Sequence, residues 1–285
     1  MDNRPIGIFD SGVGGLTVYR AIKRRLPCEK MIYLGDTARI PYGTRSPSTV
    51  KRYAYQDAAF LVKQGVKLLV VACNTISSVA LRLLQSSYDV PIVGVIEPGA
   101  KAAVRSTRNG RVGVIATEAT VESRAYELAI KNLDAEVEVF SQACPLFVPL
   151  AEEGWLEHDA TALIARHYLE PLIDAGVDTL VLGCTHYPLL RRTIQKIMGE
   201  EVMLLDSGEC VAAEIGQVLK KTAEGEAAIE DDVFYVTDSG NRFRRIANLF
   251  LDNPIGRLIA VDIWEEKVQF DEGGLGLLQE AFRKG

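Results

Sequence analysis

Two cysteines lie in nearly the same local sequence, and their thiols could do acid–base chemistry together. Cys73 ends the segment 65–73, GVKLLVVAC, and Cys184 ends the segment 176–184, GVDTLVLGC. Glycine, valine and cysteine occupy the same offsets in both segments. Two thiols in matched positions could face one substrate from opposite sides, which is the arrangement that proton exchange at a carbon centre requires.

A thiol acts as a base only after ionisation, and an ordinary cysteine, with a pKa of about 8.5, is a few per cent thiolate at neutral pH. Each cysteine precedes a predicted helix, one from Ile76 onward and one from Leu189 onward. A helix N-terminus carries unpaired N–H groups and a partial positive charge, so we expect it to favour thiolate. His186 and Asp10 could act as local proton partners. A lone cysteine is more often a small buried apolar side chain, but the matched pair favours catalysis.

Other polar side chains also follow predicted strands. In open α/β sheets the ligand binds beyond the carboxyl ends of the strands, so these side chains are candidates for one site. They are Asp10, Ser11, Asp36, Asn74, Thr75, Thr117, Thr120, Thr185, His186 and Asp206. Cys28, Cys144 and Cys210 lack such a context, and we interpret them as structural.

The turn at residues 10–15, DSGVGG, invites a nucleotide interpretation that its spacing does not support. A dinucleotide-binding G-x-G-x-x-G would need glycine where Thr17 stands, and no phosphate-binding G-x-x-x-x-G-K-[ST] is present. We expect instead a backbone that approaches a small anion such as a carboxylate, with Asp10 and Ser11 at its rim.

Two further turns could close the site. In the first, Asp36 is followed by Pro41, Tyr42 and Gly43, a rigid turn with a flexible glycine that could equally be an ordinary surface turn. In the second, Glu152 could orient His186 or be a solvated charge.

Metal or cofactor chemistry is not indicated. Cys73, Cys184 and His186 do not have the spacing of a zinc site. No motif for a redox cofactor or pyridoxal phosphate is visible, so we expect neither metal nor cofactor.

The elements that must position these residues alternate along the chain. Short apolar runs predict strands, and amphipathic stretches between them predict helices, a pattern typical of parallel sheets covered on both faces. The strands are expected at 6–9, 31–34, 68–72, 92–95, 112–116, 137–140, 180–182, 202–205, 234–237 and 258–263, and helices at 16–26, 46–64, 76–85, 211–221, 242–251 and the last twelve residues.

The two halves of the chain resemble each other at offsets of 106 and 111 residues, which indicates a duplication. We therefore predict an α/β fold of two pseudo-symmetric doubly wound domains with mainly parallel sheets and the site in the cleft between them. The first domain would comprise residues 1–97 plus 208–285, and the second residues 98–207. A hinge is expected at residues 97–99, EPG.

Composition limits the class of protein. The chain has 285 residues, 48% of them apolar, which suffices for two buried cores. Its net charge of −6 argues against nucleic-acid binding, and no apolar run reaches the ~18 residues that span a membrane. The N-terminus lacks the pattern of a signal peptide, and five cysteines without a Cys-x-x-Cys do not predict disulfides. We expect a cytoplasmic protein.

Six motifs together resemble the glutamate racemases of the aspartate/glutamate racemase family, over nearly the whole chain. They are FDSGVGG at 9–15, GD at 35–36, PYG at 41–43, ACNT at 72–75, CPLFVP at 144–149 and GCTHYP at 183–188. Aspartate racemases are similar at the cysteines but lack the first and third motifs.

The resemblance implies a cofactor-independent enzyme that interconverts L- and D-glutamate by two-base proton transfer. It implies a catalytic pair, Cys73 and Cys184, and supporting groups at Asp10, Asp36, Glu152 and His186. The substrate contacts that it implies are Asp10, Ser11, Pro41, Tyr42, Gly43, Asn74, Thr75, Thr117, Thr120, Thr185 and His186. It also implies a homodimer that supplies D-glutamate for peptidoglycan.

Two other functions fit the residues alone. A thiol-dependent isomerase or decarboxylase could act on another carboxylic acid, and one functional cysteine in place of two would favour decarboxylation. A two-domain binding module could close on an amino acid, but it would have no use for paired thiols.

Overall fold

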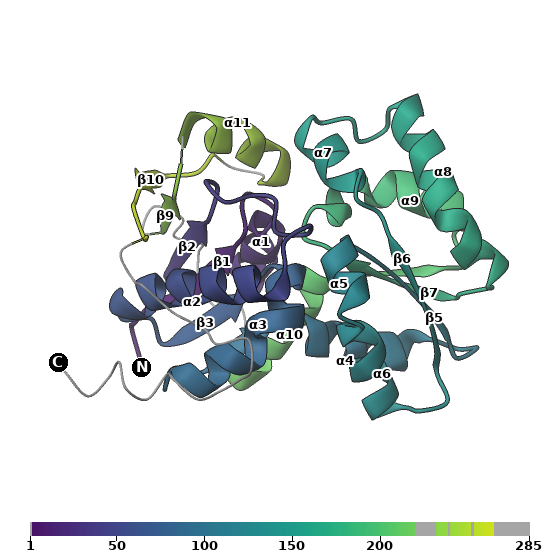
Figure 1. The fold of residues 1–285 in the computed structure, drawn as a ribbon, viewed down its shortest axis with the longest axis horizontal. Coiled ribbons are helices and arrows are strands. Elements are labelled where there is room, and N and C mark those ends of the chain that lie inside the picture. Colours follow the sequence, from purple (N-terminus) through teal and green to yellow (C-terminus); the bar gives the residue numbers. More distant parts are fainter. Residues whose placement is uncertain (1, 220–231, 239, 252–253, 265–285) are drawn as a thin grey trace.

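Two parallel sheets, each covered by helices, form the molecule (Figure 1). The computed structural model describes residues 2–219, 232–238, 240–251 and 254–264. All pairings between the described strands are parallel. The strands are β1 Ile6–Asp10, β2 Met31–Gly35, β3 Leu68–Val71, β4 Ile92–Gly94, β5 Arg111–Ala116, β6 Glu138–Ala143, β7 Thr179–Gly183, β8 Met203–Asp206, β9 Val233–Val236 and β10 Arg257–Ala260.

The helices lie between the strands in sequence, as the alternating pattern predicted. They are α1 Leu16–Arg25, α2 Pro47–Lys63, α3 Asn74–Ser87, α4 Ile96–Ser106, α5 Glu118–Glu122, α6 Ala125–Leu133, α7 Phe147–Glu152, α8 Asp159–Asp174, the 3₁₀ helix η1 Tyr187–Leu190, α9 Arg191–Met198, α10 Ser207–Val218 and α11 Gly240–Phe250.

The two sheets repeat one strand order. The first sheet is β10-β9-β2-β1-β3-β4 and the second is β6-β5-β7-β8, so β1 to β4 correspond in order to β5 to β8. The strands β9 and β10 extend the first sheet beyond β2. This shared topology confirms the prediction of two similar α/β units with parallel sheets.

The matched glycines that precede the two cysteine strands have the same backbone conformation. Gly65 has φ +73° and Gly176 has φ +65°, and each follows the end of a helix. A left-handed residue there ends a helix at little cost only if it is glycine. The repeated glycine therefore serves to direct the chain from helix to strand in both units.

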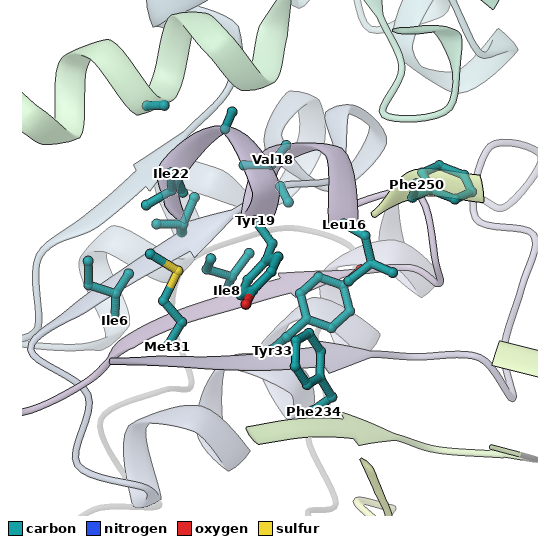
Figure 2. Packing of buried hydrophobic residues seen from close by; sticks show 14 of the residues in the cluster. Ile6, Ile8, Leu16, Val18, Tyr19, Ile22, Met31, Tyr33, Phe234 and Phe250 are labelled. Carbon is teal, nitrogen blue, oxygen red and sulfur yellow. The ribbon is translucent and has the colours of Figure 1, made fainter. Parts of the chain in front are cut away.

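Apolar side chains fill both faces of each sheet. On one face of the first sheet, Ile8, Tyr33 and Phe234 pack against Leu16 and Ile22 of α1, as Figure 2 shows. Helices α2 and α3 cover the opposite face. In the second sheet, α7, α8 and α9 contribute to one core and α4 and α6 to the other. Burial on both faces explains why these strands are continuous apolar runs.

Three expected elements differ in the structure. Residues 97–99, expected as a hinge, lie in the first turn of α4, where Pro98 is tolerated because first-turn N–H groups need no helical partner. The helix expected from residue 211 begins at Ser207, because the side chain of Asp206 accepts a hydrogen bond from Gly208 N at 2.7 Å. The helix expected from Leu189 onward begins at Arg191 as α9, because the 3₁₀ helix η1 occupies residues 187–190. The expected terminal helix lies outside the described residues.

Helices α4 and α10, which precede and follow the strands of the second sheet in sequence, pack on different sheets. Ile96, Ala100 and Ala103 of α4 belong to a core of the second sheet. Val211 and Ile215 of α10 belong to a core of the first sheet, on the side of α1.

None of the described helices combines the length and apolar character needed to cross a membrane.

Candidate active site

The two thiols lie just beyond the ends of equivalent strands. Cys73 follows β3 and is the N-cap residue of α3, and Cys184 follows β7. Each is 6% exposed. In the first sheet, Phe9 pairs with Val71, so Ser11 lies beside Cys73, and its Oγ is 3.6 Å from Cys73 Sγ. Because β3 and β7 occupy equivalent positions in the two sheets, the two thiols lie at equivalent strand ends.

The glycine-rich turn after β1 contacts the loop that carries Cys184. A Cβ on Gly14 would lie 2.4 Å from both His186 Nδ1 and Thr185 Oγ1, so no larger residue fits there. Thr17 Oγ1 donates to the carbonyl of Thr185 at 3.0 Å, and Thr185 Oγ1 donates to Asp10 Oδ1 at 3.4 Å. The turn therefore holds the polar groups of one unit against those of the other.

His186 connects Cys184 to an acidic and a basic side chain. Its Nδ1 lies 4.0 Å from Cys184 Sγ, and its Nε2 lies 3.2 Å from Glu152 Oε1. Glu152, at the end of α7, also accepts a hydrogen bond at 3.2 Å from Arg242 of α11. The ring of Phe250 meets the imidazole edge-to-face at 5.5 Å. His186 is thus enclosed by groups from both units.

Hydroxyl and amide groups after β3 bridge to the second unit. Asn74 accepts a hydrogen bond from the Tyr126 hydroxyl at 2.7 Å and donates to Ser207 at 3.4 Å. Thr75 Oγ1 lies 2.9 Å from Thr117 Oγ1 and 3.3 Å from Thr120 Oγ1. These side chains form a polar wall between α3, α5 and α6.

The turn after β2, which carries Pro41, Tyr42 and Gly43, lies against that wall. Gly43 accepts a hydrogen bond from Ala119 N at 3.1 Å, and a Cβ there would approach Thr117 to 2.9 Å. Pro41 is exposed, whereas Tyr42 is buried.

Asp36 belongs to a buried ionic cluster behind this turn. It accepts hydrogen bonds from Tyr42, Arg39 and Thr237. Arg39 also pairs with Asp57 at 2.8 Å. The described contacts of Asp36 therefore hold the Tyr42 turn and do not include either thiol.

Backbone N–H groups lower the pKa of each thiol, as expected, but burial has the larger and opposite effect. Burial, followed by the negative charge of Asp10, raises the pKa of Cys73 to about 12, although the backbone N–H of Ile76 opposes this. Burial also raises the pKa of Cys184, with a smaller opposing contribution from the backbone N–H of His186. Each thiol would carry its proton at neutral pH until a ligand changes its surroundings.

The nearby carboxylates shift in opposite directions. Burial raises the pKa of Asp10 above its ordinary value, although His186 and the N–H of Gly12 partly oppose it. Burial would raise the pKa of Glu152 as well, but hydrogen bonds and charge from His186 and Arg242 outweigh it and lower that pKa. Glu152 is therefore suited to remain a carboxylate that holds the imidazole.

Among the described residues, no group of three His, Cys, Asp or Glu side chains is arranged to hold a metal ion. Two of the cavities lined by described residues lie away from both thiols. One, of about 670 Å³, lies beside α4 and α10 and includes Lys101, Arg191 and Glu214 in its lining. The other, of about 480 Å³, lies between α3 and α6. Neither is lined by Cys73 or Cys184.

Comparison with known proteins agrees with this arrangement. Residues 6–215 match the family model described as Asp/Glu/Hydantoin racemase. The chain belongs to this family. It is 54% identical over 270 residues to a glutamate racemase from Geobacter metallireducens, covering 93% of this chain and 98% of that protein. This membership confirms the expectation of an amino-acid racemase.

Solved structures are also similar. The crystal structure of glutamate racemase isoform RacE1 from Bacillus anthracis has a TM-score of 0.86 at 39% identity, covering 92% of this chain and 98% of that one. The glutamate racemase from Francisella tularensis in complex with D-glutamate has a TM-score of 0.85 at 39% identity, covering 93% and 100%. The fold is that of these racemases.

Sequence reasoning missed several residues that support the site. Tyr126 and Ser207 hold Asn74, Thr17 holds the Thr185 loop, and Arg242 and Phe250 contact the Glu152–His186 pair. Thr17 had a local signal because it follows the glycine-rich turn, and Ser207 had one because it follows Asp206 at a strand end. Tyr126, Arg242 and Phe250 lie on helices far from the cysteines in sequence, where nothing local distinguishes them.

Proposed function

We propose that the protein interconverts L- and D-glutamate by a two-base transfer of the α-proton, without a cofactor. The observation that carries the proposal is the pair of buried thiols, Cys73 and Cys184, at equivalent ends of two sheets of the same topology. Family membership and 54% identity to a glutamate racemase support the choice of substrate.

In this mechanism one cysteine, as thiolate, removes the α-proton while the other, as thiol, donates a proton to the opposite face. The reverse reaction exchanges the two roles, which is why two similar bases are needed. Because burial raises the pKa of both thiols, their ionisation requires a trigger. The substrate ammonium would supply it, because a positive charge near a thiol favours thiolate and also offsets Asp10.

The carbanion has no electron sink, so its charge must be held by hydrogen bonds to the substrate carboxylate. Ser11 Oγ, the N–H groups of Asn74 and Thr75 at the start of α3, and Thr185 are the proposed donors. One well-aimed donor contributes about 3 kcal/mol in enzymes that stabilise oxyanions. Tyr42, Gly43, Thr117 and Thr120 complete the proposed substrate wall, next to Pro41.

The proposal also includes the domain division, the oligomeric state, the location and the cellular role. The division into 1–97 plus 208–285 and 98–207 is supported by α4 and α10, which pack on different sheets. A homodimer, a cytoplasmic location and the supply of D-glutamate for peptidoglycan rest on the family resemblance.

The test is to incubate L-glutamate with the protein in D₂O and follow optical rotation and the α-proton signal together. We expect rotation to decay to zero while deuterium enters the α-position. L-Aspartate, run in parallel, should react far more slowly. An unchanged rotation for glutamate would contradict the function, and racemisation without deuterium uptake would contradict exchange through the thiols.

A further inference from the structure

A chain of contacts runs from the surface of α11 to the second thiol. Arg242 Nη2 lies 3.2 Å from Glu152 Oε2, Glu152 Oε1 lies 3.2 Å from His186 Nε2, and His186 Nδ1 lies 4.0 Å from Cys184 Sγ. Each contact shares a side chain with the next, so the three connect Arg242 to Cys184. The first member is 60% exposed, Glu152 is 15% exposed and His186 is 8% exposed, measured on their side chains.

The chain of contacts begins in one unit and ends in the other. Helix α11 lies between β9 and β10, which extend the first sheet, whereas Glu152 and His186 belong to the unit of the second sheet. Figure 1 shows α11 and α7 facing each other across the region between the two units. An ion pair here therefore depends on how the two units are placed around the thiols.

Two apolar side chains of α11 also contact His186 and the segment that follows Glu152. Phe250 meets the His186 ring edge-to-face, and Leu249 lies 3.8 Å from the Cβ position of Gly154, two residues beyond Glu152. Apolar contact fixes how close the helix comes, and among these described contacts of α11 it is Arg242 that brings charge to the carboxylate. Its charge and hydrogen bond both lower the pKa of Glu152, which keeps that carboxylate available to the imidazole.

We propose that Arg242 is a positioning residue of the racemase, acting through Glu152 to hold the His186 imidazole beside Cys184. The inference rests on the proposed function for its catalytic consequence, but not for its structural one. Without the guanidinium, one oxygen of Glu152 loses its partner and the carboxylate can rotate away from Nε2. The ring would then keep its packing against Phe250 and Gly14 but lose the hydrogen bond at Nε2, so its Nδ1 would be less firmly fixed next to the sulfur.

Helix α11 offers a matched control. Arg245 is exposed, carries the same charge, lies three residues along the same helix, and has no hydrogen bond or ion pair with another described residue. Arg242→Ala and Arg245→Ala therefore remove the same charge from the same element. Arg242→Lys keeps the charge and tests whether an ammonium can replace the guanidinium.

The structural arm of the experiment uses the histidine rings as the probe. The chain has only three histidines, so their ring signals in a ¹⁵N-labelled sample can be resolved and His186 assigned with His186→Gln. We expect Arg242→Ala to shift the His186 ring signals and leave those of His158 and His167 in place. Arg245→Ala should leave all three in place. An unshifted His186 in Arg242→Ala would overturn the proposal.

The kinetic arm measures kcat and KM for both glutamate enantiomers. We expect Arg242→Ala to lower kcat about three- to tenfold with KM changed less than about twofold, since the lost contact serves the thiol and not substrate binding. Arg242→Lys should recover most of kcat, and Arg245→Ala should match the wild type. Equal losses in the two alanine variants would overturn the proposal. A wild type that does not racemise glutamate would instead remove the proposed function and leave the histidine signals to decide on Arg242.

Discussion

At the scale of single residues, the proposed chemistry depends on two thiols whose environments differ in detail. Cys73 has the Ser11 hydroxyl at 3.6 Å, whereas Cys184 has the His186 imidazole at 4.0 Å, and the charge of Asp10 acts on both thiols. Burial raises the pKa of both. A base that ionises only when the substrate ammonium arrives would avoid side reactions of an exposed thiolate.

Replacing either thiol by a hydroxyl should nearly abolish racemisation. A serine hydroxyl is a far weaker acid than a thiol, so Cys73→Ser and Cys184→Ser should each lower kcat by at least about 10³-fold. The measurement is decay of optical rotation from each enantiomer. Cys28→Ser, at an exposed position, is the control and should retain wild-type kcat. Turnover within tenfold of wild type in either test variant would exclude that cysteine as a base.

At the scale of elements, the two units meet through backbone as well as side chains. The turn between β1 and α1 can approach the loop after β7 because Gly14 has no side chain. The same turn positions Thr17 on the Thr185 carbonyl at 3.0 Å and, through Asp10, reaches the Thr185 hydroxyl. This explains the glycine-rich sequence without a nucleotide, because the close neighbour is protein.

A methyl group at Gly14 should disturb catalysis more than stability. In Gly14→Ala the new Cβ would lie 2.4 Å from His186 Nδ1 and from Thr185 Oγ1, so the loop that carries Cys184 must shift. We expect kcat to fall by at least about 10²-fold, since misplacement by about 1 Å has effects of this size. Gly256→Ala is the control, because a Cβ there has nothing within 4 Å among the described residues. Comparable kcat values in the two variants would contradict this account.

At the scale of the whole molecule, the site is closed around thiols that are only 6% exposed. In the proposed mechanism a substrate reaches both thiols, which would require the contacts between the units to separate. Those contacts are mostly polar: the Asn74–Tyr126 hydrogen bond, the three threonine hydroxyls and the Glu152–Arg242 pair. Polar contacts of this kind exchange with water at small net cost, which suits an interface that opens and closes.

Burial of the thiols should also make stability fall at alkaline pH. An unfolded cysteine loses its proton near pH 8.5, whereas the pKa of Cys73 is about 12 and that of Cys184 is also raised, so the folded protein retains protons that the unfolded chain releases. Stability from this source is complete below about pH 8.5 and is lost as pH rises toward the folded pKa, by at most about 1.4 kcal/mol per pH unit for each thiol.

Urea unfolding at pH 7.5, 8.5 and 9.5 would measure this loss as a change in the free energy of unfolding. The double variant Cys73→Ala/Cys184→Ala should lose less stability than the wild type over this interval, because the two buried acids are absent. Equal losses of unfolding free energy in the two proteins would show that groups other than these thiols cause the loss of stability at alkaline pH.

Local sequence was sufficient for the elements and for the identity of the two thiols. Apolar runs, amphipathic stretches and the glycines at 65 and 176 determine strand and helix positions over short distances, and all ten expected strands are present. The repeated segments around Cys73 and Cys184 pointed to equivalent strand ends, because the carboxyl ends of parallel strands share one edge of a sheet.

Tertiary structure alone decided the partners and protonation of those groups. Arg242 lies 90 residues from Glu152 in sequence and Tyr126 lies 52 residues from Asn74, so no local pattern could pair them. The net pKa shift of Cys73 could not be predicted from sequence, because a helix N-terminus is a local feature, whereas burial and the charge of Asp10 depend on how distant segments enclose the thiol. Desolvation is a property of the folded molecule, and here it outweighs the helix.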